Sequence, residues 1–138
     1  MNHICTLSDI NYLHYGICLY ESLKENSTDD FTLHYLALDE KTKTKLLELN
    51  FSNLVVYTQE DLNSKDKTFQ DLKKNNKSCP LENKKENMDI EDGHSPFHWM
   101  LSSFFSNFLL EHENLPHILY VDSDLLFYSN IDFIFDNM

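Results

Sequence analysis

The run Ile118-Leu119-Tyr120-Val121-Asp122-Ser123-Asp124 decides the fold class of this chain. Its apolar first half is typical of a buried central strand in a parallel sheet, where helices cover both faces. Two carboxylates follow directly, and an unpaired charge is costly in such surroundings. In open α/β sheets the carboxyl end of a strand is where ligands bind, so we expect the acidic pair to have a function.

Strands and helices alternate along the rest of the chain. Apolar runs suited to strands are followed by segments whose apolar residues recur at helical spacing. We predict strands at His3–Leu7, Phe31–Leu38, Leu54–Tyr57 and Ile118–Val121. We predict helices from Tyr12 to about Leu23, from Asp39 to about Leu49, from Thr58 or Gln59 through Leu72, and from Pro96 to about Glu113. This alternation indicates an α/β fold with a mostly parallel sheet flanked by helices.

The length of 138 residues and the hydrophobic content of 41% predict a single domain over residues 1–138. Residues 73–94 are dominated by Lys, Asn, Glu and Asp, and we expect them to form a flexible surface loop. Long loops in compact domains are usually lids over active sites or disordered insertions, and both alternatives stay open.

The chain is strongly acidic, with a net charge of −12 from 23 acidic residues and 11 basic ones, all of them lysines. Such a surface repels nucleic acid, so we expect no nucleic-acid partner. No stretch approaches the length of a membrane span, about 20 apolar residues, so we expect a soluble, cytoplasmic protein without a transmembrane segment. Cys5, Cys18 and Cys79 show neither a disulfide nor a zinc spacing, and we expect buried free thiols.

Asp122 and Asp124 suit a divalent cation. In an extended strand their side chains point to the same side, while that of Ser123 faces away. Mg2+ and Mn2+ accept one or two protein carboxylates and fill their remaining positions with water and phosphate oxygens, so a diphosphate would complement the pair. The alternative is that this D-x-D only caps a helix or makes a turn, as aspartate often does.

Asp9 and Tyr12 follow the first predicted strand and would share the same sheet edge as the acidic pair. An aromatic face can stack on a base, and a carboxylate or a hydroxyl such as that of Ser8 can hydrogen-bond a base edge. The alternative is that Asp9 is only a helix cap and Tyr12 only a core residue.

Two separated segments carry a family resemblance. They are Cys5–Tyr12, followed by Gly16, Leu19, Ser22 and Leu23, and residues 99–110 with 118–127, followed by 130–135. Together they resemble the nucleotide-sugar glycosyltransferases of the GT-A fold, particularly the glycogenin-like and bacterial galactosyltransferase-like branch. The first segment is similar to that family's first strand and nucleotide-binding turn, and the second to its helix and D-x-D strand.

The resemblance implies a Rossmann-like, nucleotide-diphospho-sugar transferase fold. It implies that Asp122 and Asp124 hold Mn2+ or Mg2+ against the diphosphate of a donor, most often a UDP-hexose. It also implies that Thr6, Asp9 and Tyr12 contact the nucleoside. With Ser8 at the base edge and Asp122 at the diphosphate, the expected nucleotide-binding residues are Thr6, Ser8, Asp9, Tyr12 and Asp122.

The activity implied is transfer of a hexose to an unknown glycan or other hydroxyl acceptor. The chain departs from the family in having no arginine to present to the donor, and the acceptor half would lie beyond Met138. We therefore expect only the donor-binding half, truncated after the D-x-D strand. Because a truncated sheet exposes an edge, we also expect self-association or a partner chain.

Two alternatives remain open at this point. One is a non-catalytic module that binds a nucleotide sugar or a partner chain. The other is a haloacid-dehalogenase-like phosphatase, which also uses D-x-D after a strand but normally carries the motif ahead of the rest of its fold.

Overall fold

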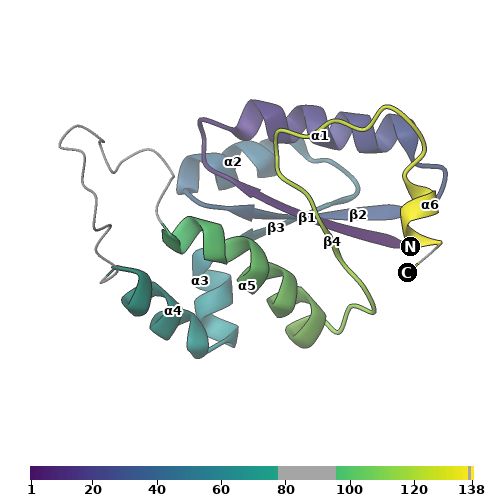
Figure 1. Ribbon diagram of the computed structural model, residues 1–138. Helices are drawn as coiled ribbons and strands as arrows, with labels where there is room; N and C mark the ends of the chain where they lie inside the picture. The colour runs from purple at the N-terminus through teal and green to yellow at the C-terminus, as the bar shows by residue number, and fades with distance from the viewer. Residues whose placement is uncertain (78–95, 137) are drawn as a thin grey trace.

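A four-stranded parallel sheet lies between two layers of helices in the computed structural model, which describes residues 1–77, 96–136 and 138 (Figure 1). The strand order is β3-β2-β1-β4, and the strands are β1 Asn2–Ser8, β2 Phe31–Ala37, β3 Leu54–Thr58 and β4 Leu119–Tyr120. All three strand pairs are parallel. The fold class expected from the sequence is therefore confirmed.

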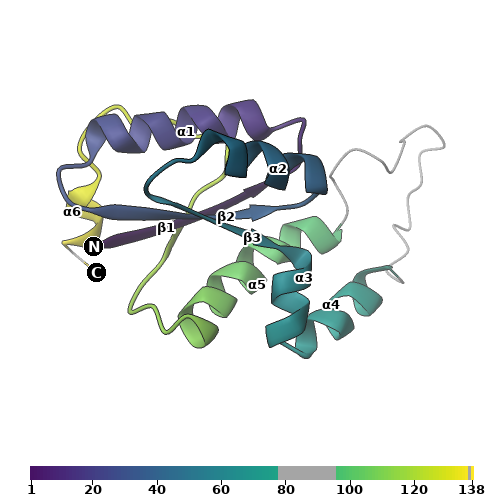
Figure 2. The same cartoon turned by 180° about the vertical axis from the view of Figure 1, so that it is seen from behind.

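The helices divide between the two faces of the sheet, as the two opposite views show (Figures 1 and 2). One face carries α1 and α2, and the other carries α3, α4 and α5, while α6 lies near the N-terminus of β1. The bounds are α1 Leu13–Asn26, α2 Glu40–Leu49, α3 Gln59–Lys65, α4 Thr68–Lys77, α5 Pro96–His112 and α6 Asp132–Phe135.

Each face of the sheet has its own apolar core because successive strand residues point to opposite sides. On the α1 and α2 side, Ile4 of β1 packs with Leu19 and Leu23 of α1 and Leu46 of α2. On the other side the core is built largely from α5, and its buried members are Cys5, Leu36, Leu62, Phe69, Leu101, Phe105, Phe108 and Leu109. The two cores together hold the sheet in the middle layer.

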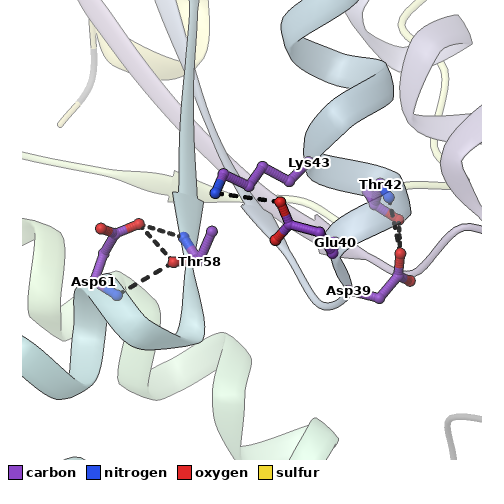
Figure 3. Close-up of polar contacts among 6 residues, drawn as sticks. All are labelled: Asp39, Glu40, Thr42, Lys43, Thr58 and Asp61. Atoms are coloured by element: carbon purple, nitrogen blue, oxygen red, sulfur yellow. Dashed lines mark hydrogen bonds and ion pairs between the residues drawn. The ribbon is translucent and has the colours of Figure 1, made fainter.

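Side-chain caps fix where α2 and α3 begin (Figure 3). The Asp39 carboxylate accepts hydrogen bonds from the backbone N–H and the hydroxyl of Thr42, at 2.8 and 3.1 Å. Thr58 and Asp61 form a reciprocal capping box, in which the Thr58 N–H donates to the Asp61 carboxylate at 2.7 Å. A cap of this kind contributes about 1 kcal/mol. Asp39 follows β2 and Thr58 is the last residue of β3, so both caps also set the strand-to-helix turns.

Asp132 ties the C-terminal segment to the start of the sheet. It is 6% exposed, and its carboxylate accepts hydrogen bonds from Asn2 Nδ2 at 2.9 Å, from the Thr28 hydroxyl at 2.6 Å and from the Thr28 and Asp29 N–H groups. These bonds lower its pKa, with that from Thr28 the largest cause. The contact joins β1, the α1 to β2 loop and α6.

Several expectations from the sequence need correction. The helix expected from Thr58 or Gln59 through Leu72 is two helices, because the Asp66 carboxylate accepts from Thr68 N–H at 2.9 Å and starts α4 there. Residues 73–77 of the loop expected at 73–94 are helical, since α4 continues to Lys77, and residues 78–94 lie outside the described residues.

Two side chains also differ from their expected burial. Cys18 is exposed rather than buried, whereas Cys5 is buried, and burial raises the pKa of the Cys5 thiol to about 11. Cys79 lies outside the described part of the chain. Trp99, expected on the buried side of its helix, is 64% exposed in the first turn of α5. None of the described helices is long and apolar enough to cross a membrane.

Candidate functional site at the carboxyl edge of the sheet

The path of the chain creates a switch point between β1 and β4. From β1 the chain moves outward through β2 to β3, then returns through α3, α4 and α5 to place β4 on the other side of β1. The helices that follow β1 and those that precede β4 therefore cover opposite faces (Figures 1 and 2). Ligands of open α/β sheets bind in the crevice outside the carboxyl ends of such neighbouring strands.

The D-x-D motif lies just past β4 at this edge. Cys5 of β1 is opposite Tyr120 of β4, and the Val121 N–H donates to the Cys5 carbonyl at 3.0 Å, so residue 122 leaves the sheet beside the end of β1. The segment then turns and runs along α1 to α6 (Figure 1). As the sequence predicted, Asp9 and Tyr12 after β1 and the acidic motif after β4 share one sheet edge.

The motif itself forms a turn and not the expected continuation of the strand. The Leu125 N–H closes this turn by donating to the backbone carbonyl of Asp122 at 3.2 Å, so the Asp122 carboxylate is not what makes it. The expected alternation is nevertheless present, because Ser123 is 7% exposed while Asp122 and Asp124 are exposed. Both carboxylates are therefore accessible to a ligand.

Tyr120 is a neighbour of Asp122 that sequence reasoning missed. Its hydroxyl donates to Asp122 Oδ1 at 3.0 Å. Burial, followed by the charge of Asp122, raises the Tyr120 pKa, so the phenol stays protonated and able to donate. The sequence could have indicated this contact, because Tyr120 and Asp122 are two residues apart and this spacing puts side chains of an extended strand on one side.

Asp9 organises the turn between β1 and α1. Its Oδ1 accepts from the N–H groups of Asn11 and Tyr12 at 3.0 and 3.2 Å. The neighbouring Ile10 N–H donates to the Asp39 carboxylate at 2.8 Å, which links this turn to the start of α2. Asp9 thus stabilises the turn before α1 and is not the helix cap that was the alternative, because the N-cap of α1 is Tyr12.

Tyr12 is not a core residue. It is 47% exposed, and its ring centroid lies 5.7 Å from that of Tyr15, one helical turn further on. An exposed aromatic face at a sheet's carboxyl edge is available for stacking on a flat ligand. Of the two roles considered for Tyr12, the surface role agrees with the structure.

Thr6 and Ser8 lie deeper than Asp9 and Tyr12. Thr6 is fully buried, and its Oγ1 has no hydrogen-bond partner in the described part of the chain. Ser8 is 4% exposed, and its hydroxyl lies 2.6 Å from the Tyr35 hydroxyl. The structure thus presents Asp9, Tyr12, Asp122 and Asp124 on the surface and holds Thr6 and Ser8 beneath them. Nucleotide contact by these residues stays a prediction.

His98 in the first turns of α5 also approaches this edge. Burial lowers its pKa, and the negative charge of Asp9 acts in the opposite direction, which places the two side chains within electrostatic reach. His98 belongs to α5, which lies far along the chain from Asp9. The order of residues in the sequence therefore did not indicate that the two side chains are near each other.

Asp122 and Asp124 suit a cation that also binds water and a phosphate ligand better than a cation bound by protein side chains alone. Among residues 1–77, 96–136 and 138, no group of three or more His, Cys, Asp or Glu side chains could hold a metal ion. Mg2+ and Mn2+ commonly use one or two carboxylates and take the remaining ligands from water and phosphate. Asp122 and Asp124 match that donor set.

Two surface hollows lie away from the motif. One, of about 340 Å3, is lined by residues at the opposite edge of the sheet, including Met1, Asp30 and Asn53. The other, of about 450 Å3, lies along α2 and includes Ile10 and Glu40. Neither hollow includes Asp122 or Asp124.

A cluster of histidines lies on the α5 side of the sheet, although the sequence shows these residues as scattered. His3 Nδ1 is 3.2 Å from His34 Nε2, and His34 Nδ1 is 3.3 Å from the Tyr57 hydroxyl. The His117 ring is tilted against that of His3, with ring centroids 6.0 Å apart. Burial, followed by the charge of the neighbouring His3, lowers the pKa of His34 to about 4. Burial also lowers the pKa of His3, so both imidazoles favour the neutral form.

The doubly wound parallel sheet is a Rossmann-like α/β fold, and it is similar to the fold of a solved glycosyltransferase. The solved structures similar to it include mouse xyloside xylosyltransferase 1 in its apo form, with a TM-score of 0.55 and 15% sequence identity. The match covers 99% of this chain and 48% of that protein, so the chain spans about half the length of its structural relative. No protein-family model and no curated protein sequence matches the chain.

Proposed function

We propose that this chain binds a nucleoside diphosphate sugar together with a divalent cation at the β1 and β4 switch point, as the donor side of a glycosyltransferase. The observation that carries the proposal is the meeting of two segments at one sheet edge. The Asp9 turn with Tyr12 follows β1, and the exposed carboxylates of Asp122 and Asp124 follow β4. The fold similarity to a xylosyltransferase supports the same class of reaction.

The charge of the chain gives a physical reason for the cation. A diphosphate approaching two carboxylates on a chain of net charge −12 is repelled, and the chain has no arginine to offset that repulsion. Mn2+ or Mg2+ held by Asp122 and Asp124 would supply positive charge at the diphosphate and stabilise it as a leaving group. Donor binding should therefore depend strongly on the metal.

The other residues of the edge orient the donor. The exposed ring of Tyr12 is the stacking surface for the base, preferably uracil. Asp9 fixes the position of the turn that carries Tyr12 by accepting two backbone hydrogen bonds. Held in this way, the sugar C1 faces outward toward an acceptor hydroxyl, and the rate gain comes from orienting the two reactants. The hydroxyl of a glycan or of another acceptor completes the reaction.

A transfer assay with a panel of UDP-hexoses and UDP-pentoses and simple glycoside acceptors, in the presence of Mn2+, tests this function. Transfer that disappears in both Asp122→Asn and Asp124→Asn supports the proposal. Metal-dependent donor binding without transfer would favour the alternative of a non-catalytic nucleotide-sugar-binding module. Absence of both binding and transfer in the folded chain would contradict both.

A further inference from the structure

Tyr120 lies at the end of β4 and reaches the first carboxylate of the acidic motif. Its hydroxyl donates to Asp122 Oδ1 at 3.0 Å. Within residues 1–77, 96–136 and 138, the Asp122 carboxylate makes no other hydrogen bond or ion pair, so Oδ2 is left for a ligand. Tyr120 is half-buried while Asp122 is exposed, so the bond runs from the packed interior to the surface.

The Tyr120 ring is itself held in place by β1 and α5. In the β1 and β4 register it lies opposite Cys5. On α5, Ser102 and Ser106 lie one turn apart on a helix that is otherwise largely apolar. The Ser102 hydroxyl donates to the Trp99 carbonyl at 2.9 Å and lies close enough to the Tyr120 hydroxyl to oppose the rise of the Tyr120 pKa, and the Ser106 hydroxyl lies 3.6 Å from Cys5 Sγ. Polar side chains thus follow the face of α5 that meets β1 and β4.

We propose that Tyr120 is a positioning residue for the cation site, holding Asp122 Oδ1 so that Oδ2 faces the metal and the donor diphosphate. The inference rests on the proposed function, since it assigns a role within the same site. Carboxylates that bind metals are usually held by such outer hydrogen bonds, and their loss typically lowers metal affinity by about 10–100-fold.

The test compares Mn2+-dependent UDP binding by calorimetry in the full chain and its variants. Tyr120→Phe removes the hydroxyl and keeps the ring, and it is expected to weaken metal-dependent binding by about 10-fold. Its UDP binding without metal should not change.

Tyr57→Phe is the matched control. Tyr57 is another partly buried tyrosine on the α5 side, with its ring against Phe105 and its hydroxyl on His34. Its loss is expected to leave the Mn2+ dependence as in the wild type. A direct Mn2+ titration followed by electron paramagnetic resonance should show the weaker site in Tyr120→Phe alone.

The possible outcomes distinguish a failure of the positioning role of Tyr120 from a failure of the proposed function. If the wild-type chain binds Mn2+ and UDP but Tyr120→Phe binds them equally well, the positioning role is wrong and the proposed function stands. Equal losses with and without metal would indicate a merely structural role and also overturn it. If the folded wild-type chain binds no UDP with Mn2+, the proposed function fails and this inference fails with it.

Discussion

Gly16 of α1 packs directly against the ring of Tyr35 in β2. A Cβ built on Gly16 would overlap the Tyr35 hydroxyl and lie 2.8 Å from two ring carbons. Tyr35 is fully buried and hydrogen-bonded to Ser8, so the ring has little room to move. The close approach of α1 to the sheet at this point therefore requires glycine.

Gly16→Ala is expected to destabilise the chain by about 1–3 kcal/mol, because an added methyl overpacks a filled site. Chemical denaturation measures the change, and Glu21→Ala on the exposed side of α1 is the control. Tyr35→Phe removes the atom nearest to the new methyl, so the double variant Gly16→Ala with Tyr35→Phe should lose less stability than the two single losses added together. Simple additivity would contradict the packing account.

His34 should make the fold sensitive to mild acid. Its folded pKa of about 4 lies below the ordinary value of 6.5, chiefly because of burial, so the unfolded chain binds the proton more readily. The contribution of His34 to the free energy of unfolding should therefore be fully present above pH 6.5. It should fall by on the order of 2–3 kcal/mol as the pH drops from 6.5 toward 4. Unfolding measured across this range checks the prediction.

The matched variants for this pH dependence are His34→Gln and His14→Gln. His34→Gln should flatten the fall in stability between pH 6.5 and 4, whereas His14→Gln, at an exposed position of α1, should leave it in place. If both variants kept the wild-type slope, the histidine cluster would not be its source.

Asp132 should stabilise the fold at neutral pH and stop doing so in stronger acid. Its pKa is lowered in the folded state, so its contribution is present above the unfolded pKa, about 3.9, and is lost as the pH falls through the lower folded value. Asp132→Asn keeps the shape but loses the charge, and we expect a cost of about 2 kcal/mol at pH 7. Asp136→Asn, at an exposed position in the same segment, should cost little. A cost that persisted unchanged below pH 3 would contradict the charge-based explanation.

Tyr12 should contribute to nucleoside binding whether or not metal is present. Stacking of a base on an aromatic side chain contributes about 1–3 kcal/mol, so Tyr12→Ala should weaken UDP binding by roughly 10-fold or more. Tyr128→Ala is the control, because Tyr128 is 87% exposed and follows the D-x-D turn. Equal UDP affinity in Tyr12→Ala and the wild type would remove Tyr12 from the site.

Much of the sheet was predictable because its signals are local. The apolar runs at β1, β2 and β3 and the cap residues Asp39 and Thr58 are read within a few residues of sequence. The break between α3 and α4 was missed because Asp66 ends one helix and caps the next within three residues.

The parts of the site that escaped prediction depend on pairs distant in sequence. The approach of His98 to Asp9 and the nearness of Ser102 to the Tyr120 hydroxyl join α5 to β1 and β4, and periodicity carries no information about such pairs. The expected parallel direction of the strands supplied the reliable part, because the carboxyl ends of parallel strands lie at one edge and bring residues 9–12 and 122–124 together. Association through an exposed edge of the sheet stays a prediction.

A calorimetric titration of the folded chain with UDP, with and without Mn2+, tests the central claim most directly. The account predicts UDP binding that Mn2+ strengthens, that loses this gain in Asp124→Asn and that keeps it in Asp30→Asn, a carboxylate change at the opposite edge of the sheet. Binding that is absent with Mn2+, or that is equally strong in Asp124→Asn, would contradict a donor site at the β1 and β4 switch point.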